Sequence, residues 1–188
     1  HRNRVLGESD RELNWGGPQL DGPLCRLGAD LPECDVVRPR REPGPEETRT
    51  LQGVFEALVA NNLGQPRVFV HRDYHSRNLM ACDSMPGILD FQDAVYGPIS
   101  YDLVSLFRDA YVRWEEAQVL DWVVRYWEKA RNARLPVRDD FAEFYRDFEW
   151  MGAQRQIKVV GIFARLCHRD GKERYLADIP RVLGYLLA

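Results

Sequence analysis

Residues 68–93 read VFVHRDYHSRNLMACDSMPGILDFQD, and this stretch decides how the rest of the chain is interpreted. It begins with an extended apolar run that ends at His71, and a polar loop follows. Two further short apolar runs, Asn78–Cys82 and Ile88–Phe91, are separated by turn-forming residues that include Pro86 and Gly87. This order predicts a short strand, a loop and then a β-hairpin.

Three polar residues stand at defined points of this pattern. Asp73 and Asn78 are five residues apart in the loop, and Asp90 ends the third apolar run. The hairpin places Asn78 at one end and Asp90 at the other, so an amide oxygen and a carboxylate come together, as a hard cation such as Mg²⁺ requires. Phosphoryl transfer of the kinase type uses such a set, with a further carboxylate facing the acceptor hydroxyl.

Each of these residues also has a structural interpretation. Asp73 alone is equally well explained as a turn residue that caps its own backbone, and Asn78 alone would be a turn residue as well. Asp90 has independent support, because a carboxylate that ends an apolar run is costly to bury without a cation or a donor.

Other charged residues in and near the loop are weaker candidates. His75 and Arg77 carry positive charge that could stabilise a transferring phosphoryl group, and a solvated or ion-paired side chain is the alternative for Arg77. We expect His71 to brace the loop through a hydrogen bond from its ring to the backbone. Asp102 stands at the start of a predicted helix, where the helix dipole stabilises a carboxylate, and it is expected to brace the same loop.

The flanking sequence is predominantly helical. Apolar residues recur at three- and four-residue steps before the loop, and the same periodicity returns after it. The residues expected to face inward are Leu51, Val54, Phe55, Leu58, Val59 and Leu63 before the loop, and Leu120, Val123, Val124 and Trp127 in a helix after it. The polar residues of 154–158 are interpreted as a solvated helix face in preference to a substrate contact. The sequence therefore predicts a mainly α (α+β) fold, with helices around a small β-hairpin that carries the catalytic loop. The predicted helices are Glu46–Leu63, Tyr101–Arg113 after an N-cap at Ser100, Glu115–Ala133, Asp139–Arg169 (one kinked helix or two, interrupted at Gly152 and Gly161), and a short helix after Pro180.

Composition narrows the class of protein. The chain has 188 residues, 45% of them hydrophobic, and a net charge of −3, which gives no reason to expect nucleic acid as a partner. No apolar run approaches the roughly 20 residues that a membrane span needs. The four cysteines are scattered without a CxxC pair, so we expect reduced thiols in a cytoplasmic protein.

The N-terminal part differs from the rest. From Trp15 to Pro45 the sequence is rich in Gly, Pro and Arg and has neither a helical nor a strand period. We therefore expect two parts, an irregular or divergent segment over residues 1–45 and a compact lobe over residues 46–188. A divergent insert, a disordered linker and an out-of-frame translation all fit this segment.

The motifs resemble those of a known superfamily. HRDYHSRN (71–78) is similar to the catalytic loop of the aminoglycoside phosphotransferase and choline kinase superfamily, and LDFQD (89–93) resembles its metal-binding segment. More narrowly, DFQDA (90–94), YGP (96–98), YDL (101–103) and GIFARL (161–166) resemble the bacterial anomeric N-acetylmuramate/N-acetylglucosamine kinases. The resemblance covers Leu51 to the C-terminus, and Trp15–Pro45 matches no part of the family.

The resemblance implies a fold, a reaction and residue roles. It implies a protein-kinase-like C-terminal lobe in which Asp73 is the catalytic base and Asn78 and Asp90 bind Mg²⁺ at the ATP phosphates. The reaction implied is ATP-dependent phosphorylation of the anomeric hydroxyl of an amino sugar salvaged from peptidoglycan.

The sequence also departs from this family. No Gly-rich phosphate loop precedes Leu51. No strand lysine precedes it either, because the lysines of the sequence, Lys129, Lys158 and Lys172, all follow the catalytic loop. We therefore expect a C-terminal lobe that by itself binds nucleotide weakly or not at all and self-associates through the apolar surface that normally contacts the partner lobe. The rival interpretations are an aminoglycoside or other small-alcohol phosphotransferase and a non-catalytic, truncated kinase-fold module.

Overall fold

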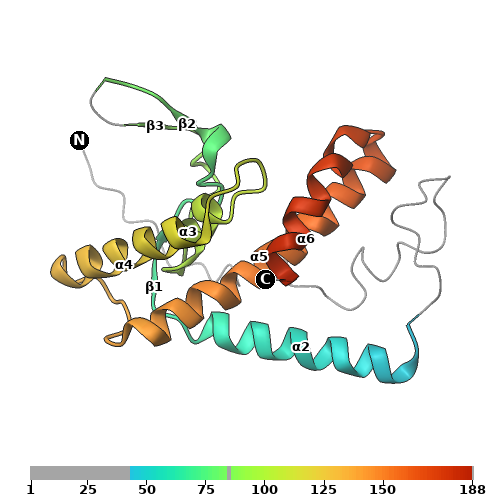
Figure 1. Ribbon diagram of the computed structural model, residues 1–188, viewed down its shortest axis with the longest axis horizontal. Helices are drawn as coiled ribbons and strands as arrows, with labels where there is room; N and C mark the ends of the chain where they lie inside the picture. The colour runs from blue at the N-terminus through green and yellow to red at the C-terminus, as the bar shows by residue number, and fades with distance from the viewer. Residues whose placement is uncertain (1–42, 84–85, 188) are drawn as a thin grey trace, which may run out of the picture.

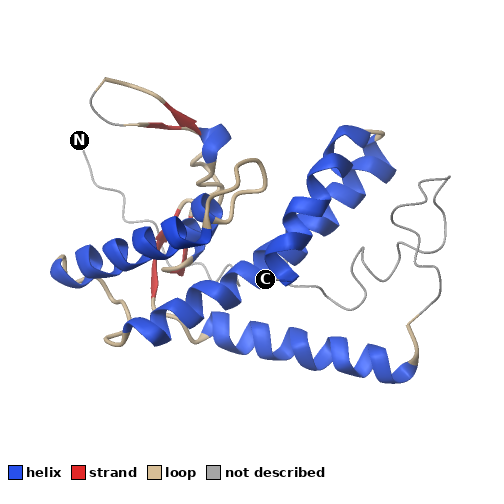
Figure 2. Ribbon diagram, in the orientation of Figure 1, coloured by secondary structure: helices blue, strands red, loops and turns tan. Residues whose placement is uncertain are grey.

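The computed structural model describes residues 43–83 and 86–187, so nearly all of the predicted N-terminal segment lies outside the described residues. The described chain is mostly helical with a few short strands (Figure 2). The helices are α2 (Pro45–Leu63), α3 (Tyr101–Phe107), α4 (Glu116–Asn132), α5 (Phe141–Asp170) and α6 (Ile179–Leu187). The strands are β1 (Arg67–Val70), β2 (Leu79–Met80), β3 (Gly87–Ile88) and β4 (Val95–Pro98), and the 3₁₀ turns are η1 (Ser76–Asn78) and η2 (Glu173–Asp178).

The strands form two small antiparallel sheets. The predicted hairpin is confirmed, since β2 pairs with β3 and Leu79 lies opposite Ile88. β1 pairs with β4, a strand that the sequence analysis did not anticipate. Along β1 the side chains alternate, with Phe69 72% exposed and Val70 only 1% exposed, so one face of this ribbon covers the core. In Figure 1 the β2–β3 hairpin projects away from the helices.

Helix α5 is the centre of the molecule. It packs against α2, α3, α4, η2 and α6, and α6 lies alongside its C-terminal part (Figure 1). The Asp140 side chain accepts a hydrogen bond from the Ala142 N–H at its start, and Gly171, with φ of 63°, ends it in the left-handed conformation. At 30 residues α5 is one helix, so neither Gly152 nor Gly161 interrupts it. None of the described helices is both long and apolar enough to cross a membrane.

The core forms two apolar clusters that α5 connects. A glycine inside a helix costs only about 1 kcal/mol relative to alanine, and burial of α5 side chains in both clusters outweighs this cost. The first cluster lies beside the β1–β4 ribbon, and its most buried members are Val70, Val104, Val119, Val123, Phe144, Phe148 and Met151. The second joins α5 to α6 through Val159, Phe163, Ile179 and Val182.

Helix α3 is shorter than the sequence predicted. It ends at Phe107 and not at Arg113, because Arg108 leaves the helical conformation and turns into the core. The Arg108 guanidinium donates hydrogen bonds to the carboxylates of Glu116, at the start of α4, and Glu149 on α5. The side chain that ends α3 therefore ties three helices together.

Two details near these helices also differ from prediction. Ser100 occupies the N-cap position of α3 as predicted, but its hydroxyl donates to the side-chain oxygen of Gln65 and makes no capping hydrogen bond. Leu120, expected to face inward on α4, is 41% exposed, whereas Val123 is fully buried as predicted.

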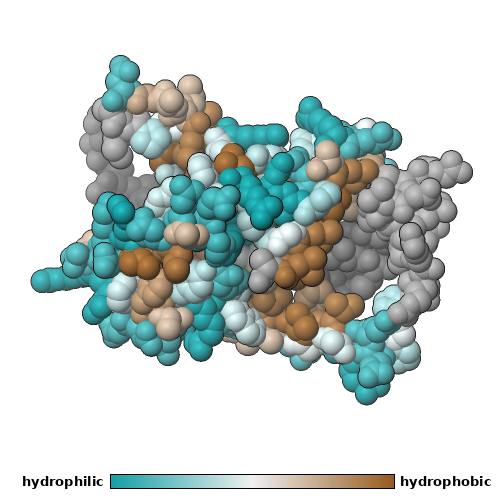
Figure 3. All heavy atoms as spheres, viewed as in Figure 1, coloured by the Kyte–Doolittle hydropathy of each residue, from teal (hydrophilic) through white to brown (hydrophobic). Residues whose placement is uncertain are grey.

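Helix α2 buries little of its apolar face. Its existence was predicted correctly, but of the residues expected to face inward only Leu58 is buried. Leu51, Val54, Val59 and Leu63 are 43–58% exposed. Figure 3 shows apolar side chains gathered along α6 and the adjoining stretch of α2 on the face presented there.

Candidate active site

The loop that follows β1 is held by the carboxylate of Asp102 in the first turn of α3. Its two oxygens accept hydrogen bonds from the backbone N–H groups of His71 (2.7 Å) and Arg72 (3.0 Å). Arg72 adopts a left-handed φ of 78°, which is unusual for a residue with a side chain, and these bonds secure it. Burial raises the pKa of Asp102, although both hydrogen bonds act in the opposite direction. The predicted bracing role of Asp102 is confirmed.

His71 contributes to this arrangement differently from the prediction. Its side chain is buried, but neither ring nitrogen has a hydrogen-bond partner among the described residues. The ring instead packs edge-on against Tyr74. The backbone N–H of His71, and not its ring, therefore holds the loop.

A hydrogen bond links Asp73 to Asn78, and a second one joins Asn78 to the residue before Asp90. The backbone carbonyl of Asp73 accepts from the Asn78 side-chain nitrogen at 2.9 Å. The backbone carbonyl of Asn78 accepts from the Leu89 N–H, also at 2.9 Å, which places Asp90 next to this contact along the hairpin. The chain of contacts runs from Asp73 through Asn78 to the residue before Asp90.

The oxygens of this chain suit a nucleotide-bound Mg²⁺. Because the Asn78 nitrogen is used by Asp73, the amide oxygen is the atom left for a cation, and the Asp90 carboxylate is exposed. Among the described residues no three His, Cys, Asp or Glu side chains form a metal cluster. Mg²⁺ commonly takes only one or two protein ligands and completes its shell with water and phosphate oxygens, so two ligands fit it.

The burial argument made for Asp90 is wrong. Ile88 and Leu89 are each 46% exposed, so the apolar run does not take the carboxylate into the core. Asp90 has a left-handed φ of 66°, and the Gln92 amide donates to its carboxylate. The unusual backbone of Asp90, and not desolvation, distinguishes this position.

Arg77 and His75 both lie against Tyr111, beyond the end of α3. The Arg77 guanidinium carbon is 3.5 Å from the centre of the Tyr111 ring, and the His75 ring meets the same ring edge-on at 5.6 Å. Arg77 is therefore neither ion-paired within the described residues nor simply solvated. The Arg77 guanidinium lies on the face of an aromatic ring, and such a contact is worth about 0.5–1 kcal/mol at an exposed site. The side chain can therefore move away from the Tyr111 ring at a small cost in free energy.

The environment of His75 disfavours the positive charge that was expected of this side chain. Burial lowers the pKa of His75 below 6.5, and the nearby Asp109 only partly offsets this. The neutral imidazole carries a buried Nδ1 without a partner in the described residues. The lowered pKa therefore favours the neutral ring of His75, which can orient a hydroxyl.

This conclusion gives a direct prediction. In a ¹H–¹⁵N NMR titration of the chain, His75 should titrate with a midpoint below 6.5, because the folded environment disfavours its charged form. The sequence has four histidines, and His75→Gln assigns the signal by its loss. A midpoint at or above 6.5 would contradict the neutral assignment.

Asp109 is a site residue that sequence reasoning missed. It is 1% exposed, and its carboxylate accepts from the backbone N–H groups of Ser76 in the loop and Tyr111, each at 2.9 Å. The loop is thus held at its start by Asp102 and near its middle by Asp109. Asp109 stands in the sequence directly after an apolar helical run, but no periodicity reveals that the helix stops at Phe107 and turns this side chain inward.

Arg155 was assigned to the wrong environment. It is 6% exposed and donates to the Ser105 hydroxyl at 2.8 Å, and that hydroxyl reaches the backbone carbonyl of Arg72. Its neighbour Gln156 is 1% exposed and donates to the carbonyl of Arg108. The polar residues on this part of α5 therefore support the loop from behind and do not form a solvated face.

Comparison with known proteins agrees with this geometry. A family described as a phosphotransferase enzyme family (APH) matches residues 18–144, more than half of the sequence. The chain belongs to this family. Membership also confirms the predicted mainly α architecture of a kinase-like C-terminal lobe.

Several curated relatives of this chain share one name, N-acetylmuramate/N-acetylglucosamine kinase. The protein from Neisseria meningitidis serogroup B is 60% identical over 186 residues, which are 98% of this chain and 53% of the relative. The protein from Pseudomonas putida is 53% identical over 174 residues, 90% of this chain and 50% of the relative. The protein from Caulobacter vibrioides is 38% identical over 143 residues, 72% of this chain and 37% of the relative.

The extent of these matches changes one expectation. The chain spans about half the length of the first two relatives. The family match begins at residue 18, and the longest alignment takes in almost the whole chain, so the likeness extends into the segment before Leu51 that the motifs left unmatched. The domain boundary near Glu46 and the roles of the site residues stay predictions.

Proposed function

We propose that this chain forms the catalytic lobe of an ATP-dependent sugar kinase that phosphorylates the anomeric hydroxyl of N-acetylmuramate or N-acetylglucosamine. The observation that carries the proposal is the hydrogen-bonded series from Asp73 through Asn78 to the hairpin at Asp90. The shared name of the relatives supports the choice of acceptor. Use of the product in cell-wall recycling is part of the proposal.

Each residue has a distinct part in the proposed reaction. The carboxylate of Asp73 accepts the proton of the acceptor hydroxyl, and its backbone carbonyl keeps the Asn78 amide in place. The oxygens of Asn78 and Asp90 would hold Mg²⁺, which screens the charge of the ATP phosphates when it is bound. Neutral His75 orients the acceptor, and Arg77 leaves the Tyr111 ring to meet the developing negative charge.

A substrate panel tests this proposal. The assay needs a completed protein, in which the part of the N. meningitidis relative that this chain does not match is joined to the chain. The completed protein should form ADP with N-acetylmuramate and N-acetylglucosamine, and much less with a 1-O-methylated sugar, because methylation removes the proposed acceptor. Turnover with kanamycin but not with the sugars would favour the aminoglycoside alternative. The absence of turnover with every acceptor tested would favour a non-catalytic module.

The chain alone should behave differently from the completed protein. We propose that it binds Mg·ATP weakly and self-associates through the exposed apolar side chains of α2, Leu51, Val54, Val59 and Leu63. A cytoplasmic location, where ATP is plentiful, completes the proposal. The free thiol of Cys82, a described and exposed residue, is consistent with it.

A further inference from the structure

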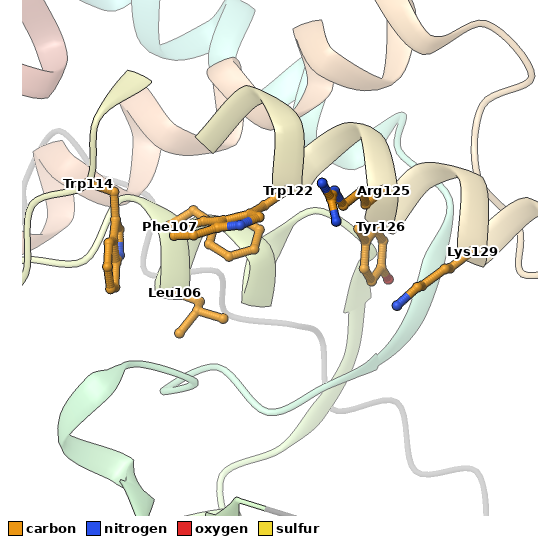
Figure 4. Close-up of a pocket in the computed structure, with 7 residues that line it drawn as sticks. All are labelled: Leu106, Phe107, Trp114, Trp122, Arg125, Tyr126 and Lys129. Atoms are coloured by element: carbon orange, nitrogen blue, oxygen red, sulfur yellow. The ribbon is translucent and has the colours of Figure 1, made fainter. Parts of the chain in front are cut away.

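A cavity of about 470 Å³ lies between α3 and α4, on residues that the proposed reaction does not use. Leu106 and Phe107 line it from α3, Trp114 from the connecting segment, and Trp122 and Tyr126 from α4 (Figure 4). Its volume falls within the roughly 300–1,000 Å³ typical of small-molecule sites. The cavity is therefore large enough to hold a ligand of modest size.

The aromatic walls of the cavity are fixed by contacts with one another and with the core. The Trp122 ring meets the Trp114 ring edge-on at 5.1 Å and lies tilted against the Phe107 ring at 5.3 Å, measured between ring centres. Tyr126 stacks on Phe144, which is fully buried. Because these rings brace one another, the cavity is pre-formed, and a flat apolar group can enter without rearranging the walls.

The charged side chains that line the cavity are all positive. Its two charged lining residues, Arg125 and Lys129, are both cations and lie one turn apart on α4. Arg125 also pairs with Asp121 at 2.9 Å, but both side chains are at least half exposed, so that pair is weak and the guanidinium can turn to a ligand. An anion fits this end of the cavity, and a cation does not.

A third polar group stands at the opposite end. The indole nitrogen of Trp114 is buried and has no hydrogen-bond partner among the described residues. In Figure 4 this nitrogen lies on the side of the ring that faces Phe107, whereas Lys129 lies at the far end of the cavity. Buried donors are normally satisfied, so this N–H marks the position of a missing acceptor.

We propose that this cavity binds a small organic anion with a flat apolar body. The body lies against the aromatic lining formed by Trp122, Phe107 and Tyr126, an acceptor atom meets the Trp114 N–H, and the negative charge lies beside Arg125 and Lys129. A neutral sugar fits poorly, because the lining between the two ends is mostly apolar and offers few partners for its hydroxyl groups.

The test uses the chain itself and a fluorescent probe of this chemistry, 1-anilinonaphthalene-8-sulfonate. Lys129→Glu should weaken probe binding about tenfold, because it replaces a charge-assisted contact by repulsion. Lys172→Glu makes the same charge change just beyond α5, outside the cavity lining, and should leave the affinity within about twofold. Trp114→Phe, which keeps an aromatic but smaller ring and removes the N–H, should weaken binding by a smaller factor.

Three results would overturn the proposal. Equal affinity for the probe in Lys129→Glu and Lys172→Glu would show that the dye rests on another apolar surface, such as α2. Binding of uncharged N-phenyl-1-naphthylamine as tightly as the sulfonate would remove the role of the cations. Loss of self-association in Lys129→Glu by sedimentation, with probe binding unchanged, would assign the cavity to contact with a second copy of the chain.

Discussion

Replacing Asp73 by Asn in the completed protein should lower kcat for sugar phosphorylation by about 10²–10⁴-fold, the usual contribution of a general base. The fold should survive, because the loop uses the backbone carbonyl of Asp73, which accepts from the His75 N–H and the Asn78 amide. The substitution keeps both bonds and removes only the negative charge. The KM for the sugar should change far less than kcat, since the lost interaction acts in proton transfer.

The matched control is Asp139→Asn, which makes the same change at an exposed carboxylate just before α5. It should keep wild-type kcat, and both variants should give the wild-type circular dichroism spectrum and melting temperature. A kcat for Asp73→Asn within threefold of wild type would remove Asp73 from the catalytic role.

The second large effect concerns the metal. Asp90→Asn in the completed protein should lower turnover at 1 mM Mg²⁺ by roughly 10²-fold or more, because metal stabilisation of phosphoryl charge is worth several kcal/mol. Asn tolerates the left-handed backbone observed at Asp90, so the substitution tests the charge and not the backbone. The rate should recover in part at high Mg²⁺, which identifies the lesion as weakened metal binding.

Two comparisons make this result specific. Asp83→Asn removes an exposed carboxylate from the same hairpin and should leave the Mg²⁺ dependence unchanged. Asp73→Asn should lose rate at every Mg²⁺ concentration without a shift in the concentration required. An identical Mg²⁺ dependence for wild type and Asp90→Asn would contradict the assignment of Asp90 as a ligand.

Local pattern was sufficient to predict most of the fold. The turn residues before Ile88 and the runs on either side specify the β2–β3 hairpin, and the apolar period of 116–132 specifies α4 within a residue at each end. The pairing of β1 with β4 was not predictable in this way. Its partners are separated by the whole loop and hairpin, and Gly97 and Pro98 in β4 are weak strand formers.

The site was predictable only where its residues are close in sequence. Asp73, Asn78 and Asp90 lie within one short segment, so spacing alone suggested that they act together. Asp109 and Arg155 come from the end of α3 and from α5, and only the folded chain places them against the loop. The hydrophobic periodicity of a sequence reports local secondary structure and does not reveal the long-range contacts that hold a loop in position.

The electrostatic environment of the site residues could not be predicted from the sequence for the same reason. His75 was expected to carry charge because an ordinary imidazole titrates near neutral pH, but its burial against Tyr111 favours the neutral form. The Asp90 carboxylate was expected to be desolvated because apolar residues precede it, yet those residues are half exposed. In both cases, the degree of burial decided the chemistry of the group.

The most direct test of the proposed phosphotransfer centre is the ³¹P NMR spectrum of the completed protein during turnover of Mg·ATP with N-acetylmuramate. The proposal predicts a new phosphomonoester resonance that is split by coupling to the anomeric proton and grows as the γ-phosphate signal of ATP declines. Loss of the γ-phosphate signal to inorganic phosphate alone, or a phosphomonoester without coupling to the anomeric proton, would contradict it.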